Sequence, residues 1–248
     1  MACKHHHRDT CDQHRRLLVQ GLAGGMLAAL FPAGRLHAVD FTLPPRLPAG
    51  QSVYEVSGKA WVNGERIDTG TVIRPNDTIK TAPGSRLVFA VGGHAMLLRG
   101  GVHLVMQGEE KGEDGQPLVN LLRLFSGALL SVSRHKGMKI FTPSASIGVR
   151  GTGVYLEAGP QKTYFCDCYG EVDVMANNDP GSKDTIQSLH HDKPLFIYNE
   201  AQHADAGSDA SSHGFLLPAI LPRRNHTDEE LMMIEALVGR TPPFAEKG

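Results

Sequence analysis

The 248-residue sequence has almost no surplus of either charge, since its 25 Lys and Arg residues and 26 Asp and Glu residues give a net charge of -1. It has no basic stripe and no RNA- or DNA-binding motif, which argues against a nucleic-acid partner. A phosphate-cradling glycine loop, a nucleophile elbow and a carboxylate pair in a catalytic setting are also missing. We therefore expect a protein that is not an enzyme.

Long apolar runs and long helical periods are scarce as well. The apolar stretch 17–31 is shorter than a membrane-spanning helix needs, and it contains three glycines. With few helical periods, the 28 Gly and 15 Pro residues favour a β protein. The length suits one domain with appendages and a sizeable core.

Residues 1–38 have the pattern of an export signal. A positively charged start precedes the apolar stretch 17–31, and Ala38 ends an acceptable cleavage site. Arg15–Arg16 resembles a twin-arginine signal, although an ordinary secretory signal fits equally well. Cleavage would leave a periplasmic protein with no stable membrane span.

From Val53 the sequence predicts a series of short strands separated by turns. Asn63–Gly64 between alternating apolar residues predicts a hairpin. The apolar segment 119–132 is broken at Ser126–Gly127, which favours a second hairpin. Strands at this spacing indicate a short-stranded β-sandwich or a solenoid-like roll.

A C-terminal extension, 177–248, follows the β domain at 53–176, and 39–52 is expected to be a linker. The extension should contain a strand near 195–198 and a flexible linker at 199–214. Thr227 and Glu230 form a capping-box pattern ahead of an apolar stripe, which predicts a helix that packs on the β body.

The segment 142–156, TPSASIGVRGTGVYL, is the most distinctive of the chain. It resembles the signature of the FecR domain, an extracytoplasmic module, through Thr142, Pro143, Arg150, Gly151 and Thr152. The likeness extends over about 53–176. The resemblance implies a non-enzymatic binding or signalling module that engages a protein or a cell-envelope component.

The FecR namesake passes a signal from an outer-membrane receptor to a sigma-factor system. Only about sixteen residues precede the apolar run here, which argues against direct anti-sigma activity. Arg150 lies among glycines, so its guanidinium could bond carboxylates or loop carbonyls bidentately. We expect it to tie the glycine-rich corner to a neighbouring strand or loop.

Cys166 and Cys168 are the cysteines that remain after signal cleavage, and period-two spacing places them on one face of a strand. Tyr164, Val172 and Val174 should share that face. Three interpretations stay open: two small core residues, a strained Cys-x-Cys disulfide, or a metal or redox site.

In the third interpretation, histidines from elsewhere in the chain complete the site. His190 and His191 precede the strand near 195 and are the best candidates. Two thiolates and imidazoles could hold a zinc, iron or copper ion. Asp167 should point to the opposite face. A metal-binding or thiol-redox protein is therefore the alternative function.

Overall fold

The computed structural model describes residues 42–133, 135–203, 213–219 and 225–245. The predicted export signal lies outside these residues. The described residues form a 15-stranded sheet arrangement and one helix, α2 (Asp228–Leu237). This confirms the mainly β fold with a C-terminal helix.

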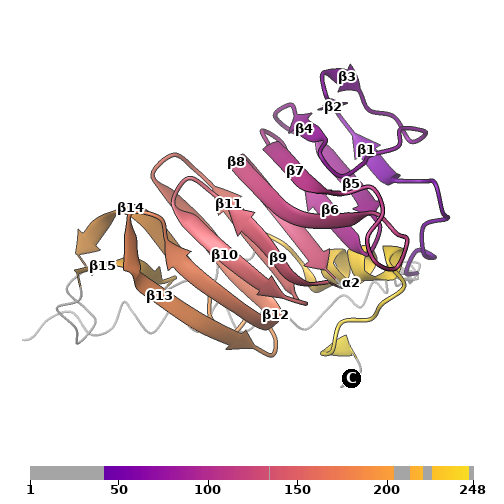
Figure 1. Ribbon diagram of the computed structural model, residues 1–248. Coiled ribbons are helices and arrows are strands. Elements are labelled where there is room, and N and C mark those ends of the chain that lie inside the picture. Colours follow the sequence, from indigo (N-terminus) through magenta and orange to yellow (C-terminus); the bar gives the residue numbers. More distant parts are fainter. Residues whose placement is uncertain (1–41, 134, 204–212, 220–224, 246–248) are drawn as a thin grey trace, which may run out of the picture. The chain divides into compact units, whose positions relative to one another are not determined.

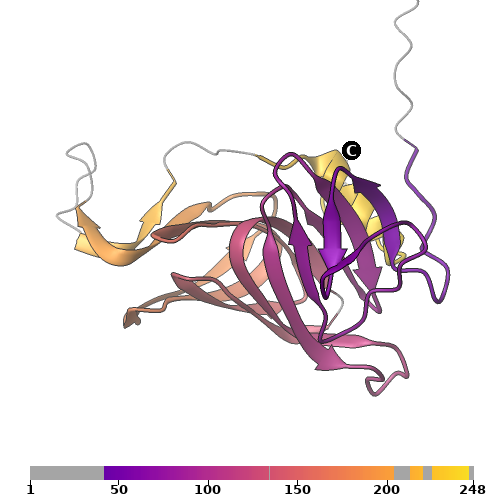
Figure 2. The ribbon, with the colours of Figure 1, turned by 90° about the horizontal axis from the view of Figure 1, so that it is seen from above.

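The strands form two layers, sheet A and sheet B, which share the long strands β8 and β12 (Figures 1 and 2). Sheet A has the order β1 (Val53–Ser57), β5 (Arg86–Val91), β6 (His94–Leu98), β8 (Leu118–Ser133), β11 (Gly153–Ala158), β12 (Lys162–Ala176), β14 (Leu195–His203) and β15 (His213–Pro218). Sheet B has the order β3 (Glu65–Arg66), β2 (Ala60–Val62), β4 (Thr78–Thr81), β7 (His103–Glu109), β8, β9 (Lys136–Phe141), β10 (Ala145–Arg150), β12 and β13 (Asp179–Ser188).

Both shared strands change sheets at a glycine with positive φ. Strand β8 pairs with β7 up to Ser126 and with β11 from Gly127, where φ is +85°. Strand β12 pairs with β11 up to Tyr169 and with β13 from Gly170, where φ is +103°. A side chain is disfavoured at such a φ, so glycine suits each crossing. The predicted hairpin at 126–127 was wrong, because β8 is one continuous strand.

Two apolar clusters stabilise this architecture. The larger lies between the sheets and includes Phe89, Leu104 and Ile140. The second covers the other face of sheet A, where α2 packs against β5, β6 and β8. Thr227 caps α2 and forms the predicted capping box with Glu230, which confirms that prediction. Helix α2 therefore closes one face of sheet A.

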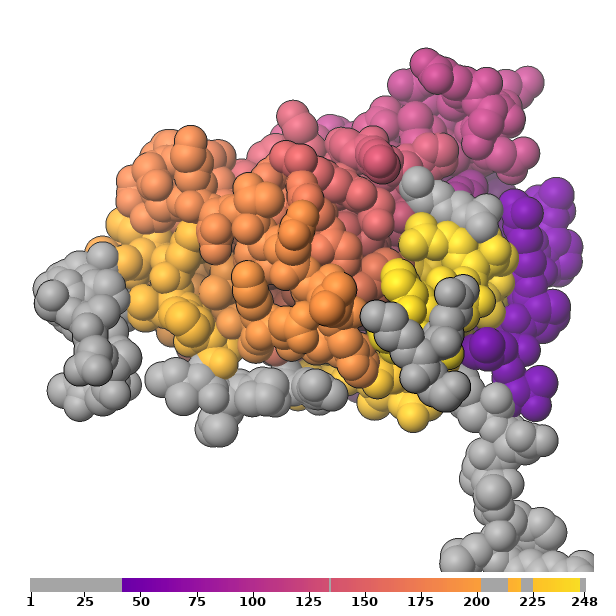
Figure 3. All heavy atoms as spheres, turned by 90° about the horizontal axis from the view of Figure 1, so that it is seen from below, coloured from indigo at the N-terminus to yellow at the C-terminus, as the bar shows by residue number. Residues whose placement is uncertain are grey.

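The C-terminal segment also contacts the first described residues. The backbone N–H of Leu47 donates to the carbonyl oxygen of Leu237 at 3.1 Å. In Figure 3 the yellow C-terminal segment accordingly lies beside the indigo start of the described chain. Helix α2 is thus held from two sides.

The hairpin at Asn63–Gly64 is confirmed, with β2 and β3 paired around two residues of positive φ. The extension contains more strands than predicted, because β13 occupies 179–188. Strand β14 extends to His203 and β15 begins at His213, so strands occupy both ends of the predicted linker. Among the described residues, no helix has the length and apolar character required to cross a bilayer.

Candidate metal centre

Strand β12 presents both cysteines, and a bulge sets their direction. Val154 on β11 pairs with Asp167, and the preceding Gly153 pairs with Tyr169, so Cys168 is the extra residue. A bulge bends its strand and re-aims a side chain. Both thiols are buried and free, on the α2 side of sheet A.

The sheet change also corrects the predicted face. Tyr164 lies in the same apolar cluster as the two cysteines, as expected. Val172 and Val174 instead lie in the cluster between the sheets. Period-two alternation applies within one sheet, and β12 passes into sheet B at Gly170.

His191 reaches the cysteines from the connection between β13 and β14. Its backbone has a φ of +55°, and its N–H donates to the carbonyl oxygen of Cys168 at 3.0 Å. Its Nδ1 lies 3.4 Å from Cys166 Sγ. A positive φ is uncommon outside glycine. This unusual backbone conformation and the hydrogen bond to β12 together fix the position of the His191 imidazole.

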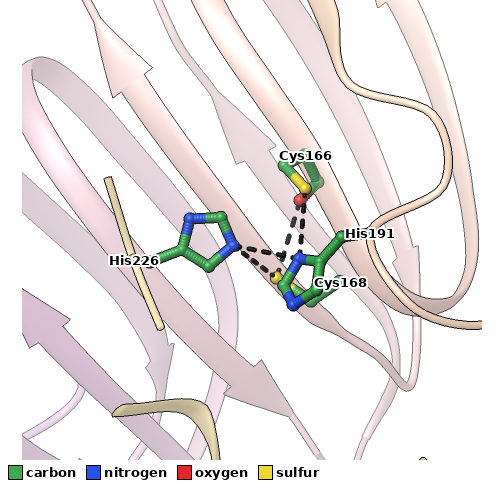
Figure 4. A group of neighbouring side chains, drawn as sticks. All are labelled: Cys166, Cys168, His191 and His226. Atoms are coloured by element: carbon green, nitrogen blue, oxygen red, sulfur yellow. Dashed lines mark hydrogen bonds between the residues drawn. The ribbon is translucent and has the colours of Figure 1, made fainter. Parts of the chain in front are cut away.

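His226, just before the helix cap, is the fourth member, and the sequence analysis missed it. Its Nε2 lies 3.4 Å from Cys168 Sγ and 3.1 Å from His191 Nδ1 (Figure 4). Its ring stacks on Tyr155 with centroids 4.2 Å apart. Docking of α2 on sheet A therefore brings this histidine to the cysteines.

The four side chains together have the geometry of a metal site. Their ligand atoms all lie within 4.8 Å of one another, and all four residues are buried. Around a tetrahedral zinc ion, sulfur and nitrogen ligands at about 2.3 and 2.0 Å would be separated by roughly 3.3–3.8 Å. The two sulfur–nitrogen separations of 3.4 Å and the nitrogen–nitrogen separation of 3.1 Å are close to this range.

His190 lies beside this cluster and outside it. Its Nε2 is 3.0 Å from both carboxylate oxygens of Asp228, and its ring stacks on Phe244. Asp228 Oδ1 is also 3.0 Å from His191 Nε2. Of the two neighbouring histidines, the structure brings His191 to the thiols and leaves His190 half-exposed over the carboxylate.

The electrostatics of the site favour one thiolate before any ion binds. The hydrogen bond from Cys168 is the main reason that the pKa of Cys166 lies well below its usual range, with His191 and His226 adding to it against the effect of burial. Burial, and then the hydrogen bond to Cys166 and the negative charge of Cys166, raise the pKa of Cys168. Burial opposes protonation of His191, but Cys166 and Asp228 outweigh it and raise its pKa.

Asp167 points away from the cysteines, into the protein. It is fully buried. Burial, and then the charge of Cys166, raises the pKa of Asp167 to about 7, although the Thr152 hydroxyl is close enough to oppose this rise by hydrogen bonding. Asp167 is therefore outside the four-residue cluster, as its place in the strand indicated.

The FecR-like residues lie at corners of the fold. Ala145 N–H donates to Thr142 Oγ1 at 3.0 Å, and Asn177 Nδ2 donates to the Pro143 carbonyl oxygen at 3.2 Å. Gly151 turns the chain between β10 and β11 with a φ of +85°. Thr152 is buried and packs closely against Gly170. A Cβ atom added at Gly170 would lie only 2.8 Å from the Thr152 side chain. Thr142 and Pro143 thus shape the turn between β9 and β10, whereas Gly151 and Thr152 shape the turn between β10 and β11.

Arg150 bonds carboxylates of the neighbouring strand β12. Its Nε and Nη2 donate to Asp173 Oδ2 at 3.1 and 2.6 Å, and its Nη1 lies 2.7 Å from Glu171 Oε1. The Arg150 side chain is 53% exposed. Because water screens exposed ion pairs, this pairing contributes little to stability.

Comparisons with known proteins leave the family open. No family model matches the chain, and no curated protein matches it. Two crystal structures of a candidate anti-sigma factor from Parabacteroides distasonis are similar, each at 14% identity, with TM-scores of 0.41 and 0.40. The match covers 57% of this chain and 58% of the other. Neither a family nor a function follows from a likeness at this level.

Proposed function

We propose that this chain is an exported, non-enzymatic binding module that holds one zinc ion between Cys166, Cys168, His191 and His226. The convergence of two buried thiols and two buried imidazoles, with their ligand atoms within 4.8 Å of one another, supports it. Two sulfur and two nitrogen ligands in a tetrahedral arrangement are typical of zinc. Thiolate sulfur is a softer ligand than the oxygen atoms that bind iron(II) or magnesium in oxygen-based sites, and this favours zinc.

A closed set of four protein ligands also supports a role without catalysis. Catalytic zinc sites keep one position for water or substrate, whereas structural sites fill all four. All four side chains are buried here, and both cysteines lie in the apolar cluster under α2. The ion would thus hold the β body and the C-terminal segment together.

The FecR-like signature supports the rest of the proposal. The likeness extends over about 53–176, which includes β12 with both cysteines, and the resemblance implies protein or envelope partners outside the cytoplasm. Residues 1–38 have the pattern of an export signal. A bound ion would also protect the two thiols from oxidation in an oxidising periplasm.

Native mass spectrometry of the protein purified anaerobically from the periplasmic fraction tests both parts. We expect a chain that begins near Val39 and carries one zinc ion. The Cys166→Ser, Cys168→Ser double variant and His226→Ala should lose the ion. His190→Ala is the matched control, because it removes a neighbouring imidazole outside the cluster, and it should keep the ion.

Three other results of these measurements would contradict the proposal, and each would indicate a different alternative. A metal-free chain whose thiols resist alkylation until unfolding would return the cysteines to the core interpretation. A metal-free mass two hydrogens below the reduced chain, restored by reductant, would indicate the disulfide. A full-length product in the inner membrane would contradict export.

A further inference from the structure

The residue before the α2 cap and the first residue of α2 both reach the candidate metal centre. His226 directly precedes the cap residue Thr227, and Asp228 is the first residue of the helix. His226 contributes a ligand atom, whereas Asp228 contacts the ligand His191 on the side away from the thiols, at 3.0 Å. This inference rests on the zinc site proposed above and concerns what controls it.

Asp228 is placed to select the form of His191 that can bind an ion. A neutral imidazole carries its proton on one nitrogen and a lone pair on the other. Because Nδ1 faces Cys166, the metal-binding form has its proton on Nε2, and Asp228 Oδ1 accepts that proton's hydrogen bond. Carboxylates behind metal-bound histidines typically fix the tautomer and the ring orientation.

The helix holds Asp228 in place without any ion. Leu231, Ile234 and Leu237 are buried against sheet A. Glu230 bridges Arg86 on β5, with Nη1 and Oε1 2.5 Å apart, and Arg99 just after β6, with Nη2 and Oε2 2.8 Å apart.

Two further contacts fix the residues just before the helix. The Arg99 guanidinium donates to the Asn225 carbonyl oxygen at 2.6 Å, and the Asn225 side chain bonds Glu157. The carboxylate of Asp228 is additionally favoured by the positive end of the helix dipole. Docking of the helix on sheet A therefore positions His226 and Asp228 beside the cysteines before any ion binds.

We propose that α2 is a component of the metal site, with Asp228 as a positioning residue for His191, so that docking of α2 on sheet A sets the zinc affinity. Thermodynamic linkage makes this coupling reciprocal: zinc stabilises the docked helix by the same factor by which docking strengthens zinc binding. A zinc-loaded chain holds the apolar face of sheet A more firmly covered than a zinc-free chain.

Zinc competition against a chromophoric chelator, under anaerobic reducing conditions, measures the role of Asp228. We expect Asp228→Asn to weaken zinc binding about 10- to 100-fold while one zinc still binds at saturation. Glu229→Gln is the matched control. It removes the same charge from the same helical turn at an exposed residue outside the cluster, and its affinity should stay within about twofold of wild type.

Hydrogen exchange with and without zinc measures the reciprocal effect in the wild-type chain and in Asp228→Asn. Zinc should slow amide exchange in 228–237, and it should do so less in Asp228→Asn. Equal zinc affinities of the wild-type and Asp228→Asn chains would overturn the positioning role. Amide exchange in α2 at the same rate with and without zinc would overturn the coupling. A wild-type chain that binds no zinc would overturn the proposed function together with this inference.

Discussion

Removal of zinc should lower the stability of the mature protein by several kcal/mol without abolishing the β fold. An ion that binds the folded chain alone adds ~4 kcal/mol when its free concentration is about a thousandfold above Kd. The large cluster between the sheets contains none of the four proposed ligands, so the sheets should remain folded in chelator. Denaturant unfolding with and without a strong chelator measures the difference.

The cysteine double variant provides the control for this measurement. Cys166→Ser, Cys168→Ser should begin at the lower stability and should not respond to chelator, because it has no ion to lose. Its circular dichroism should keep the β signature of the wild type. Wild-type unfolding curves that coincide with and without chelator would contradict a metal that supports the fold.

Acid should destabilise the protein through His94 on β6, which lies three strands from the cysteine strand β12 in sheet A. His94 begins β6 and is fully buried, and its Nε2 accepts a hydrogen bond from the Val119 N–H at 3.2 Å. Burial, and then the nearby His135, lowers the pKa of His94 to about 4 from its usual 6.5. The folded chain therefore holds this imidazole neutral.

The sign of the effect follows from the lowered pKa. The unfolded chain takes up the proton first as pH falls, so the stability is complete above pH 6.5 and is lost progressively toward pH 4. A shift of this size corresponds to about 3 kcal/mol. His94→Gln keeps an acceptor for Val119 and should flatten the loss of stability across this pH range.

Chemical unfolding from pH 7.5 to pH 4, in chelator throughout, measures this difference between the two proteins. Chelator keeps proton competition with the ion out of the comparison. His103→Gln is the matched control, because His103 lies on β7 and is only half-buried. Burial and then Lys80 lower its pKa in the same direction as that of His94, but less, so its profile should stay closer to the wild type. Parallel profiles for wild type and His94→Gln would show that His94 does not cause acid sensitivity.

Local features of the fold were predictable because short-range chemistry decides them. Asn63 and Gly64 adopt the positive φ that a two-residue hairpin requires, and Thr227 with Glu230 satisfies the exposed N–H groups of α2. The pairing of long strands depends on distant partners instead. At 126–127 a glycine allows either a turn or a change of sheet, and contact with Val102 accompanies the second outcome.

The candidate site was predictable in part for the same reason. Same-face spacing indicated Cys166 and Cys168, and proximity to a strand indicated His191. His226 stands 58 positions after Cys168 and reaches it through the docking of α2. A histidine directly before a capping box carries no signal of its own, and the bulge at Cys168 depends on the register with β11.

X-ray absorption at the zinc edge of the anaerobically purified wild-type protein tests the proposed centre most directly. We predict a four-coordinate ion with two sulfur ligands at about 2.3 Å and two nitrogen ligands at about 2.0 Å. In Cys166→Ser, Cys168→Ser the sulfur contribution should be absent. A wild-type spectrum that contains only nitrogen and oxygen ligands would contradict a zinc centre built on Cys166 and Cys168.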